Sequence, residues 1–509
     1  MALRQGNRQQ MEFLPASIEQ YVAADAPVRV YDFFVDSLDF NELGIDIDPF
    51  KEGNPSYDPR LMLKLLVYGY SYGIRSSRKL ERETYYNLSF IWLMGGLKPD
   101  HKTIAEFRRN NKEALKRALV QCVRLCLKLN LIDGNILFVD GSKIRGNASI
   151  KNTWTKEKGK KVLEKAEKRI EEIIREADAI DEEEASLPSL ATLRNDLVKA
   201  GELKEKVAGI MAELKQSEKK NLNMVDKECS RINSIHGIGA GYNAQIVVDD
   251  KNGLIVSGDA VNINNDLGQF SEQIDKAQLE LGKKCQIAVA DSGYAWTDDL
   301  EEIDRQGIQV IVPTQRIASG KKAGEFAKQN FRYDSEKDCY TCPMGETLKY
   351  AWLDRKSNTR IYRLEKEGVC LSCAAFGKCT RAKSGRKIMR LVQEEVRDRL
   401  EQEYSLLWNQ AIYKRRQEKV ELVFGHLKRN LGVQSFLLRG LEGAKAEISV
   451  LSICFNVRRM LSLLGGKGLI EKLKAVRLQM ASLLRCFLFS LLAPTGCLNF
   501  ISEIVTQSE

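Results

Sequence analysis

The amino-acid sequence predicts an α/β protein with a mixed sheet at its centre, a helical segment before the sheet and two insertions within it. Three observations support this prediction. Capped helical patterns fill residues 1–130, strand patterns begin at residue 131, and 509 residues are enough for two or three folding units. Hydrophobic residues make up 43% of the chain and charged residues 29%, which excludes a largely disordered protein.

Charge and apolar segments narrow the class of protein further. The net charge of +10 is a modest excess, so basic residues must cluster before they indicate nucleic-acid binding. The first residues, MALRQGNRQQMEFL, lack the apolar centre of a secretory signal. The longest apolar stretch, near residues 480–494, is interrupted by Arg485 and is shorter than a membrane span. We therefore expect a cytoplasmic protein.

Residues 1–130 form the first predicted domain, a set of short helices. Asp58 and Pro59 suit the N-cap and first position of one helix, and Asp100 suits the N-cap of a later one. Basic residues lie on and between these helices: Arg75, Arg78, Lys79, Lys102, Arg108 and Arg109. The segment suits a helix-turn-helix-like DNA-binding domain, and it suits a helical bundle with ordinary surface charge equally well.

From residue 131 the pattern changes to a sheet, and we assign the core to residues 131–154 and 223–318. The order is a strand ending in an acid, a hairpin, a helix, a second strand ending in an acid, a helix and a last strand. These elements span residues 136–140, 244–261, 266–281, 286–291, 297–306 and 308–313. This order matches the ribonuclease-H-like fold, in which the first and fourth strands lie side by side. Because sites of open α/β sheets lie at the carboxyl ends of strands, we expect Asp140 and Asp291 to meet at one edge.

A third acid is expected from the helix that resumes the core in residues 401–465. In YKRRQEKVELVFGHLKRNLG the apolar residues form one stripe, and Glu421 lies on its border together with Lys428. Glu418 lies nearly opposite the stripe, so we do not expect it to reach the sheet. Converging carboxylates suit Mg²⁺ or Mn²⁺, and two such ions support phosphoryl transfer. Each acid also has an ordinary interpretation, as a cap at a strand end or as a surface charge beside a lysine.

Two insertions interrupt this core, and the second holds a cysteine cluster. Residues 155–222 are rich in Lys and Glu and predict a hairpin of charged helices. Residues 319–400 contain two C-x2-C pairs and a fifth cysteine: Cys339, Cys342, Cys370, Cys373 and Cys379. The two pairs predict a zinc-ribbon-like site with one structural Zn²⁺, and Cys379 is the alternative ligand. A redox pair or reduced buried cysteines is the competing interpretation.

Taken together, these blocks resemble the DDE transposases of bacterial insertion sequences, over residues 57–461. YDPRLMLKLLVYGY and PDHKTIAEFRR resemble the N-terminal domain of that family, whereas LFVDGSKIRGNAS, ADSGYAWTDDL and VELVFGHLKRNLG resemble the blocks that carry its acids. The resemblance implies that Asp140, Asp291 and Glu421 are the catalytic, metal-binding acids. It also implies that Lys428 is the family's basic residue, and we expect Lys428 and Arg429 to hold the reacting DNA strand.

The family implies a DNA transposase that cuts and joins the ends of its own element. Its expected partners are the terminal inverted repeats, the target DNA and a second copy of the chain, and DNA binding would associate it with the nucleoid. Two rival functions share these features: a nuclease on the same core, and a DNA-binding protein that has lost catalysis.

The sequence departs from the family in two places. Many relatives have Tyr and Arg at the positions of Lys414 and Gln417, whereas here Tyr413 and Arg416 lie one position earlier. This shift makes the roles of Tyr413 and Arg416 uncertain and leaves that of Glu421 unaffected. The apolar tail, residues 466–509, has no counterpart in the family.

Overall fold

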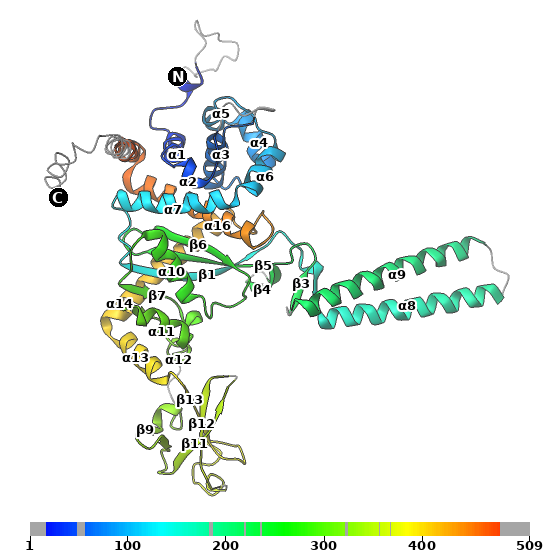
Figure 1. Ribbon diagram of the computed structural model, residues 1–509, viewed down its shortest axis with the longest axis vertical. Coiled ribbons are helices and arrows are strands. Elements are labelled where there is room, and N and C mark those ends of the chain that lie inside the picture. The colour runs from blue at the N-terminus through cyan, green and yellow to red at the C-terminus, as the bar shows by residue number, and fades with distance from the viewer. Residues whose placement is uncertain are drawn as a thin grey trace, which may run out of the picture.

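The computed structural model describes residues 17–47, 56–182, 187–217, 220–234, 237–320, 324–355, 357–366 and 368–478. A layer of helices lies against a central sheet, a pair of long helices projects from one side, and a small β unit lies at the far end (Figure 1). The predicted mixture of helices with a mixed sheet is confirmed.

The helical layer comes from the first part of the chain. Its helices are α1 (Pro27–Asp36), α2 (Phe40–Leu43), α3 (Pro59–Ser71), α4 (Ser77–Tyr86), α5 (Leu88–Leu93), α6 (His101–Asn110) and α7 (Lys112–Lys128). The predicted caps are present, because the Asp58 side chain accepts a hydrogen bond from the Arg60 backbone N–H and Asp100 accepts one from Thr103. Nearly all of α3 is buried, which places it inside the layer rather than on its surface.

The central sheet has six strands in the order β4-β5-β1-β7-β8, with β6 paired to β5. Their bounds are β1 (Ile136–Arg145), β4 (Ser230–Ser234), β5 (Gly237–Asp249), β6 (Ile255–Val261), β7 (Ile287–Val289) and β8 (Gln309–Ile311). β1 pairs antiparallel with β5 and parallel with β7, and β7 pairs parallel with β8. The first and fourth strands of the predicted order, β1 and β7, are therefore neighbours.

Helices cover the sheet and join it to the helical layer. They are α10 (Phe270–Leu281), α11 (Thr297–Arg305), α13 (Glu394–Ser405), α14 (Leu407–Arg416), α15 (Leu422–Arg429) and α16 (Leu441–Leu464). A π-helical turn, Gln417–Glu421, connects α14 to α15. Because α16 contacts α3, α7 and β6, the helical layer and the sheet share one continuous hydrophobic core.

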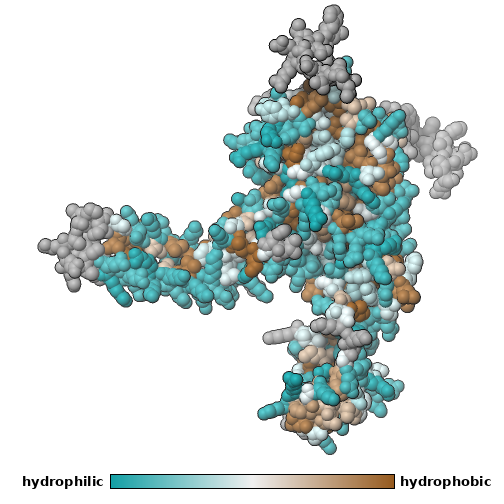
Figure 2. All heavy atoms as spheres, turned by 180° about the vertical axis from the view of Figure 1, so that it is seen from behind, coloured by the Kyte–Doolittle hydropathy of each residue, from teal (hydrophilic) through white to brown (hydrophobic). Residues whose placement is uncertain are grey.

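The projecting arm is a pair of helices, α8 (Lys156–Glu182) and α9 (Leu187–Gln216). Two short strands at its base, β2 (Thr153–Thr155) and β3 (Asn221–Asn223), pair antiparallel. A small apolar cluster fills the base, and the face of the arm seen in Figure 2 is mainly hydrophilic over its coloured residues. The arm leaves the core after β1 and returns before β4, so it interrupts the sheet only in sequence.

The small β unit is a five-stranded sheet in the order β13-β12-β11-β10-β9. Its strands are β9 (Arg332–Asp334), β10 (Cys339–Thr341), β11 (Thr347–Asp354), β12 (Thr359–Arg363) and β13 (Lys387–Leu391). It has its own apolar cluster around Tyr340 and Tyr362, separate from the main core. A short helix, α12 (Gln315–Ala318), lies between β8 and this unit.

Within the described part of the chain, no single helix is long and apolar enough to cross a membrane. One bent pair, Leu441–Leu464 with Gly466–Leu478, passes that test by length and composition only. The apolar stretch near residues 480–494 lies outside the described residues.

Candidate active site

Two aspartates meet just beyond the point where the parallel pairing of β1 with β7 ends. The prediction that Asp140 ends its strand is wrong, because β1 continues through Arg145 in antiparallel pairing with β5. Asp140 lies in β1 opposite Ile246 of β5, and its side chain is 14% exposed. Asp291 follows β7 and caps the short turn Ser292–Tyr294, in which the Gly293 N–H donates to the Asp291 carboxylate at 2.8 Å. The parallel pairing of β1 with β7 is what brings residues 140 and 291 to the same edge.

Arg416 joins these two acids to Glu421. Its guanidinium nitrogens lie 3.4 Å from Asp140, 3.9 Å from Asp291 and 4.0 Å from Glu421. The Arg416 side chain is 12% exposed, whereas that of Glu421 is 56% exposed. The three acids predicted from the sequence thus converge on one cation that is largely withdrawn from solvent.

The π-helical turn explains why Arg416 and Glu421 face the same way. In a regular α-helix, residues five positions apart lie about 140° apart around the axis. A π turn closes its hydrogen bonds over five residues instead of four, so it takes up one extra residue. The turn Gln417–Glu421 therefore returns Arg416 to the side of Glu421, which compensates for its position one residue early in the sequence.

Burial and charge determine the protonation of this cluster. Burial raises the pKa of Asp140 to about 6, Arg416 opposes the rise, and the neighbouring Asp291 and Asp266 add to it. Burial alone would lower the pKa of Arg416, but Asp140, Asp291 and Tyr413 together raise it by more, so its net shift is upward. The site therefore holds a permanent cation beside an aspartate whose charge is costly.

A lysine approaches the cluster from the following helix. Lys428 of α15 donates to the Ser142 hydroxyl at 2.6 Å, and Ser142 lies two residues after Asp140 in β1. Burial lowers the pKa of Lys428, while Asp140 opposes that change. The Lys428 residue is still exposed to solvent, as is the neighbouring Arg429.

The donor set suits a divalent cation, although a protein cation stands among the acids. Among the described residues, no three His, Cys, Asp or Glu side chains are arranged to hold a metal ion. Arg416 Nη1 is buried without a hydrogen-bond partner, so its contacts to the acids are loose ion pairs. Three carboxylates gathered around one loosely held cation are the hard oxygen ligands that Mg²⁺ and Mn²⁺ prefer.

Two transposase family models match the chain. One is described as a transposase domain (DUF772) and matches residues 16–110, and the other is described as a transposase DDE domain and matches residues 341–461. This chain is a DDE transposase. The second match contains Glu421, Arg416 and Lys428, whereas Asp140 and Asp291 lie before it.

Other comparisons add little to this result. No curated protein matches the transposase. A solved structure, a piggyBac transposase synaptic complex with hairpin DNA, is 8% identical with a TM-score of 0.33, over 96% of this chain and 86% of that chain.

The N-terminal basic residues of the transposase fall into two groups. Arg75 donates to the Gly432 and Ser435 carbonyls and to Glu447, and Arg108 donates to Tyr70, Ser77 and the Arg75 carbonyl. Both arginines are buried, so their guanidinium groups bind protein in place of the predicted DNA phosphates. The remaining four are exposed to solvent: Arg78, Lys79, Lys102 and Arg109.

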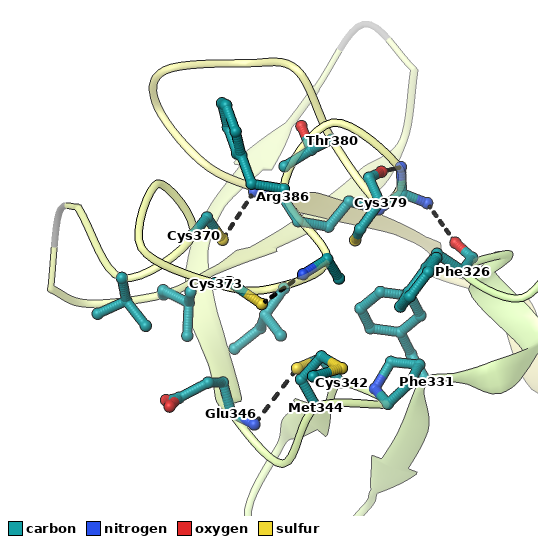
Figure 3. A pocket seen from close by; sticks show the side chains of 16 residues that line it. Phe326, Phe331, Cys342, Met344, Glu346, Cys370, Cys373, Cys379, Thr380 and Arg386 are labelled. Carbon is teal, nitrogen blue, oxygen red and sulfur yellow. Dashed lines mark hydrogen bonds between the residues drawn. The ribbon is translucent and has the colours of Figure 1, made fainter.

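Four cysteines of the small β unit surround one small cavity. They are Cys342, Cys370, Cys373 and Cys379 (Figure 3). Backbone N–H groups donate to three of the sulfurs: Glu346 to Cys342 at 3.3 Å, Arg386 to Cys370 at 3.4 Å and Ala375 to Cys373 at 3.5 Å. Cys339 is buried in β10 and does not line the cavity, whereas Cys379, which the sequence offered as the alternative ligand, does.

Sequence reasoning missed Asp266 at the acidic site, and it left open the role of Arg416, which lies one position early. Arg416 stands out of phase with Glu421 in a regular helix, and a π turn leaves no pattern in the residues themselves. Asp266 contributes to the raised pKa of Asp140 from a loop between β6 and α10. A loop acid has no periodicity that would indicate where it points, so only the folded sheet reveals it.

Proposed function

We propose that this transposase cleaves and joins the DNA ends of an insertion sequence by using Asp140, Asp291 and Glu421. The observation that supports this most directly is the convergence of the three carboxylates on Arg416, from the middle of β1, the turn after β7 and the π-helical turn. We further propose that the central sheet is a ribonuclease-H-like core, because β1 lies between β5 and β7 in the order expected of that fold.

The three carboxylates would hold Mg²⁺ or Mn²⁺. When bound, such ions supply a nucleophilic oxygen and neutralise charge on the phosphoryl group in the transition state. The protein contributes the rest. Asp140 and Asp291 are held by strand pairing and a capped turn, which keeps the acids in place before DNA arrives.

Basic side chains beside the acids would hold the reacting strand. Lys428 can exchange its bond to Ser142 for a bond to a phosphate oxygen without moving far. Arg416 can neutralise a phosphate from the side of Glu421, and Arg429 is exposed near the same end of α15. These residues contact the sugar-phosphate backbone, so they would position DNA without reading its sequence.

The division of labour follows the parts of the chain. We assign end recognition to residues 1–130 through the exposed Arg78, Lys79, Lys102 and Arg109, and catalysis to the sheet with residues 401–465. We assign residues 155–222 to the charged helical arm and residues 319–400 to the cysteine unit. We assign no function to residues 466–509. Two ends must be brought together, so we expect a homodimer that holds both terminal inverted repeats and the target DNA.

We also propose one structural Zn²⁺ held by Cys342, Cys370, Cys373 and Cys379. The four cysteines line one cavity, and three of their sulfurs accept backbone N–H bonds, which would help to stabilise zinc-bound thiolates. Purified, reduced protein should contain one zinc per chain by elemental analysis. Cys379→Ser should lose that zinc while Cys339→Ser keeps it, and the reverse result would return Cys339 to the ligand set.

Substitution of each acid tests the catalytic proposal. Asp140→Asn and Asp291→Asn should each abolish cleavage of the terminal repeat in both Mg²⁺ and Mn²⁺, while leaving DNA affinity within about threefold. Asp250→Asn is the control, because Asp250 is an acid of the same sheet region that pairs with Arg415. Cleavage by either active-site variant at the wild-type rate would refute the assignment.

A further inference from the structure

A buried polar network lies directly behind the two aspartates. The Asp266 carboxylate accepts hydrogen bonds from the side-chain amides of Asn243 at 2.6 Å and Gln245 at 2.9 Å. The Gln245 amide oxygen in turn accepts a hydrogen bond from the Tyr294 hydroxyl. Gln245, Asn243 and Tyr294 are each fully buried, and Asp266 is 22% exposed, so the network reaches solvent only at its acidic end.

This network touches both aspartate-bearing segments. Gln245 of β5 lies opposite Gly141, the residue after Asp140, and Tyr294 ends the turn that Asp291 caps. A Cβ atom on Gly141 would lie 2.5 Å from both Asp266 and Gln245 and 3.0 Å from the Tyr294 hydroxyl. Gly141 therefore leaves the space through which the network packs against the backbone of β1.

The direction of the hydrogen bonds is determined by charge. Burial and the nearby Asp266, Asp140 and Asp291 raise the pKa of Tyr294 well above its usual value, so its hydroxyl keeps its proton and acts as a donor. Gln245 must then accept through its oxygen and donate through its nitrogen, and Asp266 must accept. The Lys143 ammonium lies 3.6 Å from Asp266 and balances the negative charge of that carboxylate at the end of the hydrogen-bond network.

We propose that Asp266 and Tyr294, linked by Gln245, are positioning residues that set the separation of Asp140 and Asp291. β1 and β7 pair through only three residues on this edge, Ile136 to Phe138 with Ile287 to Val289, and that pairing ends before either aspartate. The Tyr294–Gln245–Asp266 network spans the gap beyond the last paired residues. This inference rests on the proposed catalytic role of the two aspartates.

The choice of metal ion gives a readout that a purely structural role would not change. Mg²⁺ requires near-ideal octahedral geometry, and Mn²⁺ tolerates larger departures from it. If loss of the network displaces the Asp140 or Asp291 carboxylate, cleavage should therefore be impaired far more in Mg²⁺ than in Mn²⁺. Removal of a catalytic acid should instead abolish cleavage with both ions, which distinguishes failure of this inference from failure of the proposed function.

Tyr294→Phe tests the proposal, with Tyr242→Phe as the matched control. Tyr242 is also fully buried in this sheet, and its hydroxyl donates to Asp226 at 2.7 Å, away from the acids. We expect Tyr294→Phe to lower Mg²⁺-supported cleavage on the order of 10–100-fold. Mn²⁺ should restore most of it, and terminal-repeat affinity should not change. Tyr242→Phe should leave the ratio of Mg²⁺ to Mn²⁺ activity at the wild-type value.

A second measurement is the binding of Mn²⁺ in the absence of DNA. The electron paramagnetic resonance signal of the free ion reports how much Mn²⁺ is unbound. Tyr294→Phe and Asp266→Asn should both weaken Mn²⁺ binding relative to Tyr242→Phe. Asp266→Asn preserves side-chain shape, so it remains informative if Tyr294→Phe does not fold. Wild-type Mn²⁺ affinity together with a wild-type ratio of activities in the folded variants would overturn the proposal.

Discussion

Two arginines that are largely withdrawn from solvent make opposite use of the same side chain. Arg75 makes three hydrogen bonds of 2.5–3.0 Å, two to carbonyls of the segment between α15 and α16 and one to Glu447 of α16. Arg416 lies among three carboxylates at 3.4–4.0 Å, and its Nη1 has no hydrogen-bond partner. Short bonds to backbone carbonyls hold a fold together, whereas loose contacts to several acids leave a cation able to exchange partners. We therefore expect loss of Arg75 to reduce stability and loss of Arg416 to reduce activity.

Arg75→Ala should have the largest effect on stability. Its removal would leave Glu447, which is 2% exposed, as a buried charge without its partner. We expect the free energy of unfolding to fall by about 3–5 kcal/mol, as for other broken buried pairs. Urea denaturation of the variant would measure this, and Arg78→Ala, at an exposed site three residues away, is the control. If Arg75→Ala lowers the free energy of unfolding as little as the control does, Arg75 has no structural role.

Asp140→Asn should increase stability in a pH-dependent way. Burial raises the pKa of Asp140 from 3.8 to about 6, so the folded protein binds this proton more tightly than the unfolded chain. The stabilisation from protonation is fully present below about pH 4 and is lost as the pH rises through about 6. At pH 8 the neutral amide of the Asp140→Asn variant should therefore add up to about 3 kcal/mol to the free energy of unfolding.

Denaturation curves in a metal chelator at pH 4 and pH 8 would check this sign. The wild-type protein and the Asp140→Asn variant should differ at pH 8 and coincide at pH 4. Equal curves at both values would mean that the Asp140 carboxylate is well solvated, and the acidic site would lose its electrostatic basis.

Arg416→Gln should separate the two arginines most clearly. Its partners Asp291 and Glu421 are 37% and 56% exposed, so water can replace the guanidinium around them. Its nearest partner, Asp140, is 14% exposed, but its raised pKa lets it take up a proton when the guanidinium is lost. We expect a change in unfolding free energy on the order of 1 kcal/mol. Cleavage of the terminal repeat should nevertheless fall by about 100-fold, because a cation beside the phosphate is lost. A variant as unstable as Arg75→Ala would show that Arg416 is structural too.

The smallest effects are expected at the exposed N-terminal residues. Arg78→Ala and Lys79→Ala should each weaken binding of the terminal repeat and reduce the dependence of log K on log salt by about 1. Fluorescence anisotropy titrations at several salt concentrations would measure this in the full-length protein. Unchanged salt dependence in both variants would move DNA recognition to another surface of the molecule.

The sequence could predict the acids because each follows from a local pattern and a rule of topology. Asp140 and Asp291 each follow an apolar run, and Glu421 borders an apolar stripe, so strand order and helical phase predict that all three meet, although β1 continues past Asp140 to Arg145. The same reasoning failed at Arg75 and Arg108, because clustered basic residues look alike in sequence whether they face solvent or a carboxylate. It also favoured Cys339 over Cys379, because spacing along the chain does not say which side of β10 a thiol faces.

The residues that escaped prediction depend on irregular geometry. Arg416 returns to the site through a π turn, and Asp266 reaches it from a loop through a gap left by Gly141. Neither feature has a period in the sequence. Irregular elements of this kind are often found at functional sites, where the backbone departs from regular geometry so that a few side chains can be placed correctly.

Cleavage of the terminal repeat by Glu421→Gln and Glu418→Gln, measured side by side, tests the acidic site most directly. Both glutamates belong to the same π turn, and both are exposed, but only Glu421 contacts Arg416. We predict that Glu421→Gln binds the repeat and does not cut it in Mg²⁺ or Mn²⁺, whereas Glu418→Gln cuts at the wild-type rate. Cleavage by Glu421→Gln together with an inactive Glu418→Gln would contradict the assignment and move the third acid to the opposite side of the helix.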